Sequence, residues 1–503
     1  MTHSTTVRPV APVTRGARAV VVVPSRSLDR LHEPASVTQA LEERLLCSLL
    51  ELSDPDLRMT YVTSSPIPAS IVDYQLSLLP PRVRAGARSR LTLVALGDPS
   101  HRPLSEKLLG RPALLERITR SIPGDRPAYL SPYQSTDAEG ELAAALGIPL
   151  YAADPCHEPL GSKSGGRALF AESDVPCPAG VEGLTSVDEV VAAIASLRAS
   201  RPDLEELVLK LDRGVSGDGN AIVDVSRLPE SGATDEALAI RGRLAALEPE
   251  AAGVSASAFL ARLAAGGGIV EERITGVELR SPSVQIQIDP DGEAAVVSTH
   301  DQILGGANGQ KYLGCRFPAE TSYAPLISGL ALRVGRRLAD RGVIGRLALD
   351  FVVVRSPCGG WRAYAIEINL RKGGTTHPYE TLRALTGGTY DPAAVQFTTP
   401  TGAGRHYVAT DHLESPALCA LGRPGVLALA RRPELRFDAI RRTGTTFHML
   451  SSVNDAGRIG FTAIADGADE ADALYRATRR TLLDAGEAAA ARGVDRNVLP
   501  LAA

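Results

Sequence analysis

The first third of the chain alternates short apolar runs with amphipathic stretches. The apolar runs predict strands at residues 19–24, 59–63, 91–96 and 127–130. The amphipathic stretches predict helices at residues 40–52 and 112–121. Strands that alternate with helices form an open α/β layer. We therefore predict an N-terminal α/β domain over residues 19–160, preceded by a disordered tail at residues 1–18, where Thr, Pro and Arg are frequent.

Two further units follow in the middle of the chain. In the first, over residues 161–235, helices are predicted at 165–174 and 186–199, and strands at 206–210 and 220–226, with a Gly-rich loop between the strands. In the second, over residues 236–401, helical patterning at 236–263 precedes a strand-rich stretch, a long helix at 324–341 and a hairpin. These patterns predict a mixed α/β (α+β) fold.

The last hundred residues, 402–503, show strand patterns at 445–450 and 457–465 and a terminal helix at 469–491. We interpret this segment as a self-contained α+β domain. We expect it to cover the site from the side on which an incoming substrate arrives.

The hairpin in the sequence FVVVR-SPCGG-WRAYAIEIN predicts a cluster of oxygen ligands. If Ser356 faces Trp361 across the turn, the register sets Asp350 opposite Glu367. Because side chains alternate along a strand, Asn369 lies on the same face as Glu367. The opposite face then points six apolar side chains into a core: Leu349, Phe351, Val353, Ile366, Ile368 and Leu370.

Two carboxylates and a carboxamide on one face are suited to Mg²⁺, which takes oxygen ligands and is held by one or two carboxylates together with substrate phosphates. The sequence therefore predicts a metal site at Asp350, Glu367 and Asn369. The alternative interpretation is an acidic, solvated hairpin face.

Composition narrows the classes of function. The chain has 503 residues, enough for three or four domains, and a net charge of -4, which argues against broad binding to nucleic acid or to an anionic membrane. The six cysteines are scattered without paired spacing, which suits a reducing cytoplasm. No apolar stretch is long enough for a membrane span. We expect a cytoplasmic protein that acts on small molecules.

A second motif predicts a phosphate-covering flap. Lys210 ends a strand, and Gly214, Gly217 and Gly219 in the following loop free the backbone to close over an anion. A strand follows the loop, whereas a P-loop would open a helix. The alternative is a glycine-rich hairpin with an incidental lysine.

The segment IVEERITGVELR predicts a nucleotide-binding hinge. Backbone groups of Glu272, Arg273 and Ile274 are placed to bond an adenine edge, Glu271 to accept from its amino group, and Glu278 to hold ribose hydroxyls. Without the flap, the same pattern describes an amphipathic hairpin with a charged outer face.

The order of these parts resembles the ATP-grasp superfamily. Lys163, Lys210 with its flap, the VEERITGVE hinge, Asp350 and the Glu367-Ile-Asn369 triplet follow one another as the parts do in that family, over about residues 162–380. The resemblance implies that Lys163 contacts the α-phosphate of ATP and that Lys210 lies beside the adenine and phosphates. It also implies that the Asp, Glu and Asn side chains hold two Mg²⁺ ions, with Mn²⁺ as the alternative ion.

The resemblance also implies a basic residue that steadies the transferred phosphoryl group. Arg371, two residues past Asn369, is our choice, and Arg346 is the alternative. The loop that follows is predicted to receive substrate carboxylate or acyl-phosphate oxygens through its NH and OH groups; it consists of Gly373, Gly374, Thr375 and Thr376.

Three further polar residues each have two possible roles. His377 is interpreted as orienting the loop, with a catalytic base as the alternative. His300 and Asp301 either contact the substrate or form a satisfied buried pair.

A narrower resemblance is to the pheganomycin-type peptide ligases, carried by segments 298–319, 367–382 and 443–475. It implies an ATP-grasp fold with an N-terminal pre-ATP-grasp domain and an extra C-terminal domain. It also implies an ATP-dependent ligase that joins a carboxylate donor to an amino-acid or peptide amine. The alternatives are a nucleotide-binding protein without turnover and an acid–thiol (CoA) ligase. The oligomeric state is open, and a homodimer is one alternative.

Overall fold

The computed structural model describes residues 19–26, 35–124, 127–214, 219–251, 253–306, 309 and 311–497. The predicted tail and Gly217 of the flap lie outside these residues.

The N-terminal unit is a parallel sheet with the strand order β3-β2-β1-β4. Its strands are β1 (Ala19–Val23), β2 (Arg58–Thr63), β3 (Leu91–Ala95) and β4 (Ala128–Pro132). Its helices are α1 (Ala35–Glu42), η1 (Glu43–Ser53), α2 (Ala69–Ser77), α3 (Pro81–Ser89), α4 (Leu104–Leu109), α5 (Pro112–Ser121), α6 (Asp137–Leu146) and η2 (Pro155–Gly161). Val20 and Val22 enter one core while Val21 and Val23 enter another. The sheet is therefore covered on both faces, as predicted for an α/β layer.

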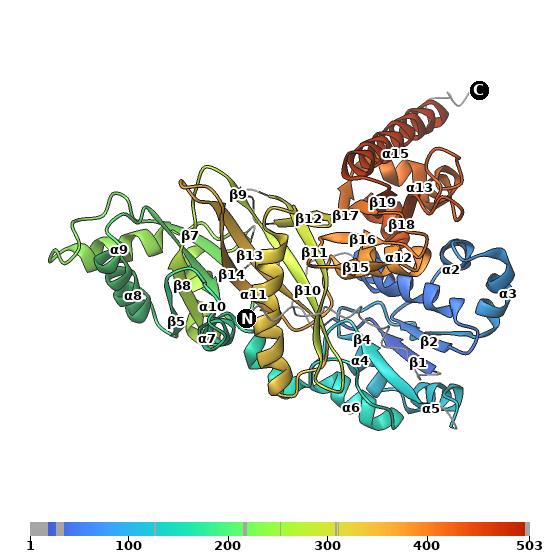
Figure 1. The fold of residues 1–503 in the computed structure, drawn as a ribbon, viewed down its shortest axis with the longest axis horizontal. Helices are drawn as coiled ribbons and strands as arrows, with labels where there is room; N and C mark the ends of the chain where they lie inside the picture. The colour runs from blue at the N-terminus through green and yellow to red at the C-terminus, as the bar shows by residue number, and fades with distance from the viewer. Residues whose placement is uncertain are drawn as a thin grey trace, which may run out of the picture.

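The second unit is a small antiparallel sheet with the order β5-β8-β6-β7, which lies at the far left of Figure 1. Its strands are β5 (Gly180–Leu184), β6 (Glu206–Leu211), β7 (Asn220–Asp224) and β8 (Gly268–Glu272). Its helices are α7 (Lys163–Glu172), α8 (Val187–Ser200), α9 (Glu236–Ala245) and α10 (Ala256–Gly266). Ile240, Phe259 and Val270 belong to the core of this small unit, so this core extends past residue 235, where we predicted the boundary.

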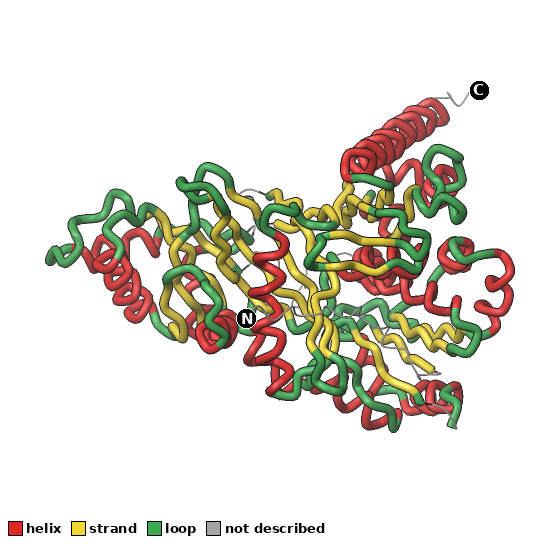
Figure 2. The backbone as a smooth tube through the Cα atoms, viewed as in Figure 1, coloured by secondary structure: helices red, strands yellow, loops and turns green. Residues whose placement is uncertain are grey.

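The large sheet is 9-stranded and runs β14-β13-β10-β11-β12-β17-β19-β18, with β9 paired to β13. Its strands are β9 (Leu279–Arg280), β10 (Pro282–Ile288), β11 (Ala294–Gly305), β12 (Lys311–Phe317), β13 (Gly345–Arg355), β14 (Trp361–Asn369), β17 (His406–Glu414), β18 (Gly444–His448) and β19 (Arg458–Ala465). Figure 2 shows these strands as a continuous yellow layer crossed by one long helix, α11 (Ala324–Asp340).

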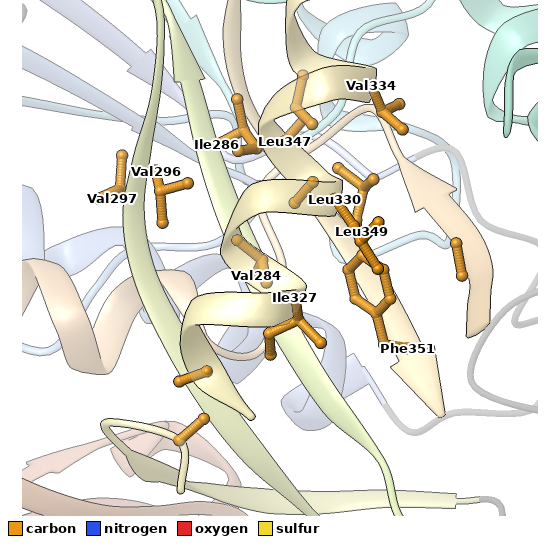
Figure 3. Close-up of a cluster of buried hydrophobic side chains, with 14 of the residues drawn as sticks. Val284, Ile286, Val296, Val297, Ile327, Leu330, Val334, Leu347, Leu349 and Phe351 are labelled. Carbon is orange, nitrogen blue, oxygen red and sulfur yellow. The ribbon is translucent and has the colours of Figure 1, made fainter. Parts of the chain in front are cut away.

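Helix α11 closes the apolar face of this sheet. Ile327 and Val334 from the helix meet Val284, Ile286 and Leu347 from the strands in one buried cluster (Figure 3). This packing leaves the opposite, polar face of β10 and β13 for the site, because side chains alternate along each strand.

After β14 the chain forms α12 (Thr376–Thr386), β15 (Thr389–Asp391) and β16 (Gln396–Thr398). The C-terminal segment then adds the helices α13 (Pro416–Leu429), η3 (Leu450–Ser452), α14 (Val453–Ala456) and α15 (Ala468–Asn497) to the strands β17, β18 and β19. It contacts both the large sheet and the N-terminal unit. Strand β17 pairs with β12, so the last three strands extend the large sheet. Phe447 and Phe461 share a core with Val20 and Leu46 of the N-terminal unit. The segment therefore forms an additional α+β region, as predicted, but its strands continue the large sheet and its core is shared with the N-terminal unit.

Candidate active site

Asp350 lies opposite Glu367 across the β13–β14 pair, as predicted, but the register reaches that pairing differently. Arg355, rather than Ser356, faces Trp361 at the turn end. A β-bulge between Asp350 and Phe351 shifts the pairing by one, because Phe351 pairs with Ala365 and skips Ile366. The bulge restores the alignment of the two carboxylates.

The bulge also changes which residues enter the core. Ile366 is only half buried and lies outside the core cluster, which corrects its prediction as a core residue, whereas Ala363 and Ala365 belong to that cluster. Four of the predicted core residues are buried as expected, namely Leu349, Phe351, Val353 and Ile368. Leu370 packs against the cluster while partly exposed.

The three predicted ligand side chains contact one another. Asn369 Nδ2 donates to Asp350 Oδ2 (3.0 Å) and to Glu367 Oε1 (2.8 Å). Gln302 Nε2 donates to Asp350 Oδ1 (3.0 Å), and Arg371 Nη2 donates to Asn369 Oδ1 (2.8 Å). Asn369 thus bridges the two carboxylates, which lie side by side as the negative groups of this face.

Burial and the adjacent charge of Glu367 raise the pKa of Asp350 to about 7. Burial alone would raise the pKa of Glu367 as well, but the ammonium group of Lys163 outweighs it and holds that pKa at about 2. Two half-buried, ionised carboxylates side by side repel each other, and a bound cation offsets this repulsion. The oxygen donor set and its charge fit Mg²⁺.

Lys163 connects the small unit to this cluster. It is the first residue of α7, which begins where Ser162 Oγ accepts from Gly165 N (2.9 Å). Its Nζ forms an ion pair with Glu367 Oε2. The lysine that the family resemblance assigns to a phosphate therefore lies against the ligand strand.

Lys210 lies in a buried ionic cluster. Its Nζ pairs with Glu271 Oε1, and Arg167 Nη1 pairs with Glu271 Oε2 at 3.1 Å. Both oxygens of Glu271 are bonded to cations, so an adenine amino group would share an oxygen with Lys210 or Arg167. The flap glycines at either end, Gly214 and Gly219, pass so closely that a Cβ on Gly219 would lie 3.0 Å from Gly214 Cα.

Several hydrogen-bonding groups of the predicted nucleotide-binding hinge already have partners within the protein. The amide N–H of Glu272 donates to Ala179 O (2.7 Å), and that of Arg273 donates to Glu206 O (3.2 Å). Glu278 pairs with Arg355 at 2.7 Å. Among the three backbone positions named for adenine, these contacts leave Ile274, just past the end of β8, as the strongest candidate.

The loop after β14 is fastened at several points. Gly373 N donates to Thr376 Oγ1 (2.9 Å), which donates to Gln285 Oε1 (3.0 Å), and Gln285 Nε2 donates to Thr375 O (3.0 Å). Thr375 and Thr376 are buried. A Cβ on Gly374 would lie 2.5 Å from the ring of Tyr312. The two threonines therefore shape the loop, while its glycines remain candidates for contact with a substrate.

Of the remaining predicted polar residues, His300 and His377 are buried, and Asp301 is half-buried. His300 has no exposed surface, bonds Tyr407 Oη through Nε2 (2.7 Å), and has a pKa lowered to about 3 by burial. Asp301 Oδ1 accepts from Tyr323 Oη (2.7 Å). The predicted alternative of a satisfied buried pair is therefore not met, because each residue bonds a tyrosine rather than the other and buried His300 Nδ1 has no partner among the described residues. Burial also lowers the pKa of His377 to about 4.

A cavity of ≈ 120 Å³ lies where the N-terminal unit, α12 and the large sheet meet. Arg346 extends into it: Nε donates to Gln287 Oε1 (3.1 Å), Nη2 donates to Glu380 Oε1 (2.8 Å), and buried Nη1 has no partner among the described residues. Arg346 is four residues from Asp350 on β13, or about 13 Å along the strand. Arg371, which bonds Asn369, is much closer to the ligand cluster.

Lys372 lies between the cavity and the ligand cluster. Its Nζ donates to Ser131 Oγ (2.8 Å) and Pro132 O (2.6 Å), and its N–H donates to Tyr133 O (3.1 Å). Burial lowers its pKa to about 8. The loop is thus bonded to the N-terminal unit as well as to the sheet.

Comparison with known proteins identifies the class to which this fold and site belong. The family described as IQCH-like, ATP-grasp matches residues 156–246 and 254–393, and the PGM1 C-terminal domain matches residues 425–478. The chain is 30% identical over 476 residues, 93% of its length and 94% of the relative's, to an L-propargylglycine–L-glutamate ligase of Streptantibioticus cattleyicolor. This chain belongs to the ATP-grasp superfamily.

A second relative is the IQ motif-containing protein H of Danio rerio, 24% identical over 88% of this chain and 46% of that protein. Two solved structures share the fold with TM-scores of 0.56 at 13% identity. One is a biotin carboxylase of Campylobacter jejuni with β-γ-ATP, covering 94% of this chain and 95% of that one. The other is the biotin carboxylase domain of a Hydrogenobacter thermophilus 2-oxoglutarate carboxylase with MgADP, covering 94% of each. None of the described helices has both the length and the apolar character needed to cross a membrane.

Sequence reasoning missed several residues of the site. Arg167 was detectable, because it lies one helical turn after Lys163 and so shares its face of α7. Gln302 lies two positions after His300 on β11, yet its contact with Asp350 depends on strand order. The partners of His377, which are Asp411 and His448, come from strands more than thirty residues away and carry no local signal.

Proposed function

We propose that this protein is an ATP-dependent ligase that joins the carboxylate of one amino acid to the amine of a second amino acid or peptide, releasing ADP and phosphate. The observation that carries the proposal is the cluster of Asp350, Glu367 and Asn369 in contact with Lys163 and Arg371. The 30% identity to a ligase that joins two amino acids supports the substrate class.

The reaction has two balanced steps. A carboxylate oxygen attacks the γ-phosphorus of ATP, the bond to the β-phosphate oxygen breaks, and ADP leaves. The amine then attacks the carbonyl carbon of the acyl-phosphate, the bond from that carbon to the phosphate oxygen breaks, phosphate leaves with this oxygen, and the amine nitrogen loses a proton. Bound Mg²⁺ supplies charge neutralisation for the phosphates at the carboxylate cluster.

The chain's own residues have separate tasks in this scheme. Lys163 and Lys210 hold phosphate groups, and Arg371 steadies the oxygens of the transferred group. The fastened loop after Arg371 keeps that guanidinium in one place. Water exclusion matters here because an acyl-phosphate hydrolyses readily.

We place one amino-acid substrate in the cavity beside Arg346. Its walls combine apolar side chains with charged ones, including Val22, Leu45, Val296, Val297, Arg346, Glu380 and Lys372. The unpartnered Arg346 Nη1 is a buried donor that a substrate carboxylate would satisfy. This assignment replaces the alternative in which Arg346 steadies the phosphoryl group.

The test is ADP release measured over a panel of amino acids, with and without a second amino acid, and with hydroxylamine as a trap for the acyl-phosphate. We expect ADP and a hydroxamate with one amino acid alone, and an amide when the second is added. Arg346→Met should raise KM for one amino acid and leave KM for ATP unchanged, while Arg336→Met on the exposed face of α11 changes neither. A thioester formed with coenzyme A in place of an amide would assign the protein to the acid–thiol ligases instead.

Finer details belong to the same proposal. Two Mg²⁺ ions at the cluster, replaceable by Mn²⁺, would follow the pattern of the superfamily, and a cytoplasmic location suits a substrate such as ATP. ADP release without any amide, thioester or hydroxamate product would favour a nucleotide-binding protein that has lost ligation.

A further inference from the structure

His377, Asp411 and His448 meet at one point in the interior. The distance from His377 Nε2 to His448 Nε2 is 3.0 Å, from His448 Nε2 to Asp411 Oδ1 is 2.7 Å, and from His377 Nε2 to Asp411 Oδ1 is 3.0 Å. All three residues are buried, and the imidazole planes are 70° apart. The two rings therefore approach the same carboxylate oxygen from different directions.

Hydrogen bonds do not satisfy this triangle in any tautomer. If both Nε2 atoms carry a proton, two donors face each other at 3.0 Å. If only one carries a proton, the lone pair of the other faces Asp411 Oδ1 at 3.0 Å or less. A cation bound by all three atoms offsets these repulsions, because each lone pair then faces the ion.

The size of the triangle fits such an ion. Its circumradius is about 1.7 Å, so an ion about 2.1 Å from each atom lies about 1.3 Å out of the plane, with angles near 90° between its ligands. Two imidazoles and one carboxylate in this arrangement select divalent transition ions, whereas Mg²⁺ prefers oxygen. A void of ≈ 10 Å³ next to both histidines, also bordered by Arg44 and Gln75, has room for about one water as a further ligand.

The fold builds this arrangement from three elements. His377 is the second residue of α12, and Asp411 lies in a β-bulge of β17, between Thr410 and Leu413, a feature that re-aims side chains. His448 lies over its cross-strand partner Gly460, where a Cβ would come 2.1 Å from Nε2. Arg44 of η1 bonds the other oxygen of Asp411 at 2.8 Å and so orients the carboxylate.

We propose that His377, Asp411 and His448 bind a divalent transition-metal ion, in a site separate from the Mg²⁺ cluster. The ion fastens the start of α12, and with it the loop from Arg371 to Thr376, to strands β17 and β18. Removing the ion frees the end of that loop without changing a residue of the ligand cluster.

The first measurement uses the full-length protein without a histidine tag. The protein is incubated with one equivalent of Zn²⁺, Fe²⁺, Mn²⁺ or Co²⁺, desalted, and analysed by inductively coupled plasma mass spectrometry. We expect about one retained equivalent of at least one of these ions, and a Tm several degrees higher than after stripping with dipicolinate. Retention below about a tenth of an equivalent for every ion, with no change in Tm, would overturn the proposal.

Variants locate the ion. His377→Gln and His448→Gln keep a side chain that can hydrogen-bond, and each should lose the metal and the metal-dependent rise in Tm. Gly460→Ala should do the same by displacing His448. His412→Ala is the matched control, because His412 is adjacent to Asp411 but bonds Arg458, and it should retain the metal. Full retention in both glutamine variants would rule out this site.

The outcome is independent of the proposed ligase activity, because metal content and Tm are measured without ATP or substrate. Glu367→Gln removes a ligand of the Mg²⁺ cluster and should retain the transition metal in full. If Glu367→Gln loses the ion while His448→Gln keeps it, the ion belongs to the Mg²⁺ cluster and the proposal fails.

Discussion

Glu367 is held between a cation and a neutral amide donor, because its Oε2 pairs with Lys163 from the small unit while its Oε1 accepts from Asn369 on the same strand. The carboxylate is therefore a point at which the small unit and the large sheet are linked by charge. A cation and a nucleotide phosphate that enter this cluster compete with, or replace, contacts that the protein now makes with itself.

Glu367→Gln and Asn369→Ala should lower the rate of ADP formation at least about 100-fold, equivalent to about 3 kcal/mol of transition-state stabilisation. The reason is the loss of one oxygen ligand at the cluster. Glu293→Gln, an exposed residue in the turn before β11, is the control and should be unchanged. Steady-state ADP release at saturating Mg²⁺ measures the effect, and near-normal turnover in both variants would contradict the metal assignment.

Lys210→Met should raise KM for ATP about ten- to a hundred-fold, because a charge-assisted bond to phosphate is lost. The protein should still fold, since Arg167 remains to pair with Glu271. Arg262→Met removes a charge from the exposed side of α10 and serves as the control. Calorimetric ATP affinity equal to that of the wild type would exclude a phosphate role for Lys210.

Gly219→Ala should weaken ATP binding by a steric route, because the new Cβ meets the backbone of Gly214 at 3.0 Å. Gly242→Ala is a matched control, since no atom lies within 4 Å of its added Cβ and the helix α9 gains up to about 1 kcal/mol of stability. Titration calorimetry with ATP compares the two. Equal affinities would show that closure of the flap does not depend on this crossing.

Glu43→Gln should remove part of the pH dependence of stability. Burial raises the pKa of Glu43 to about 7, against partial compensation by the hydrogen bonds from Ser451. The unfolded chain loses this proton near pH 4.5 and the native protein only near pH 7, so stability falls as pH rises between these values, by up to about 3 kcal/mol. Urea unfolding at pH 5 and pH 8 should show a smaller fall for the variant, and an identical fall would contradict the shift.

A chain that ends at residue 401 should fail to fold cooperatively. It lacks β17, β18 and β19, which exposes the edge of β12 and removes Phe447 and Phe461 from a core shared with the N-terminal unit. Circular dichroism melting tests this, with a chain that ends at residue 492 as the control. A truncated protein with a sharp melting transition would restore the interpretation of an independent C-terminal domain.

Local patterns in the sequence determined most of the secondary structure and the carboxylate cluster. Alternation along β13 and β14, with one short turn between them, was enough to place Asp350, Glu367 and Asn369 together, because the ligands are neighbours on a single hairpin. The predicted pairing of Asp350 with Glu367 is confirmed. The predicted register at the turn is wrong by one residue, and the bulge at Ile366 corrects for this difference before the chain reaches Glu367.

Only the tertiary structure decided the contacts between distant segments. The junction of His377, Asp411 and His448 depends on β17 lying between β12 and β19, and the cavity beside Arg346 depends on the N-terminal unit packing against α12. Strand order and domain packing are set by many weak apolar contacts spread over the whole chain, so they cannot be predicted from a local motif. The sequence by itself therefore determined the superfamily and the chemistry of the ligand cluster, while the cavity beside Arg346 and the junction of His377, Asp411 and His448 depend on the folded chain.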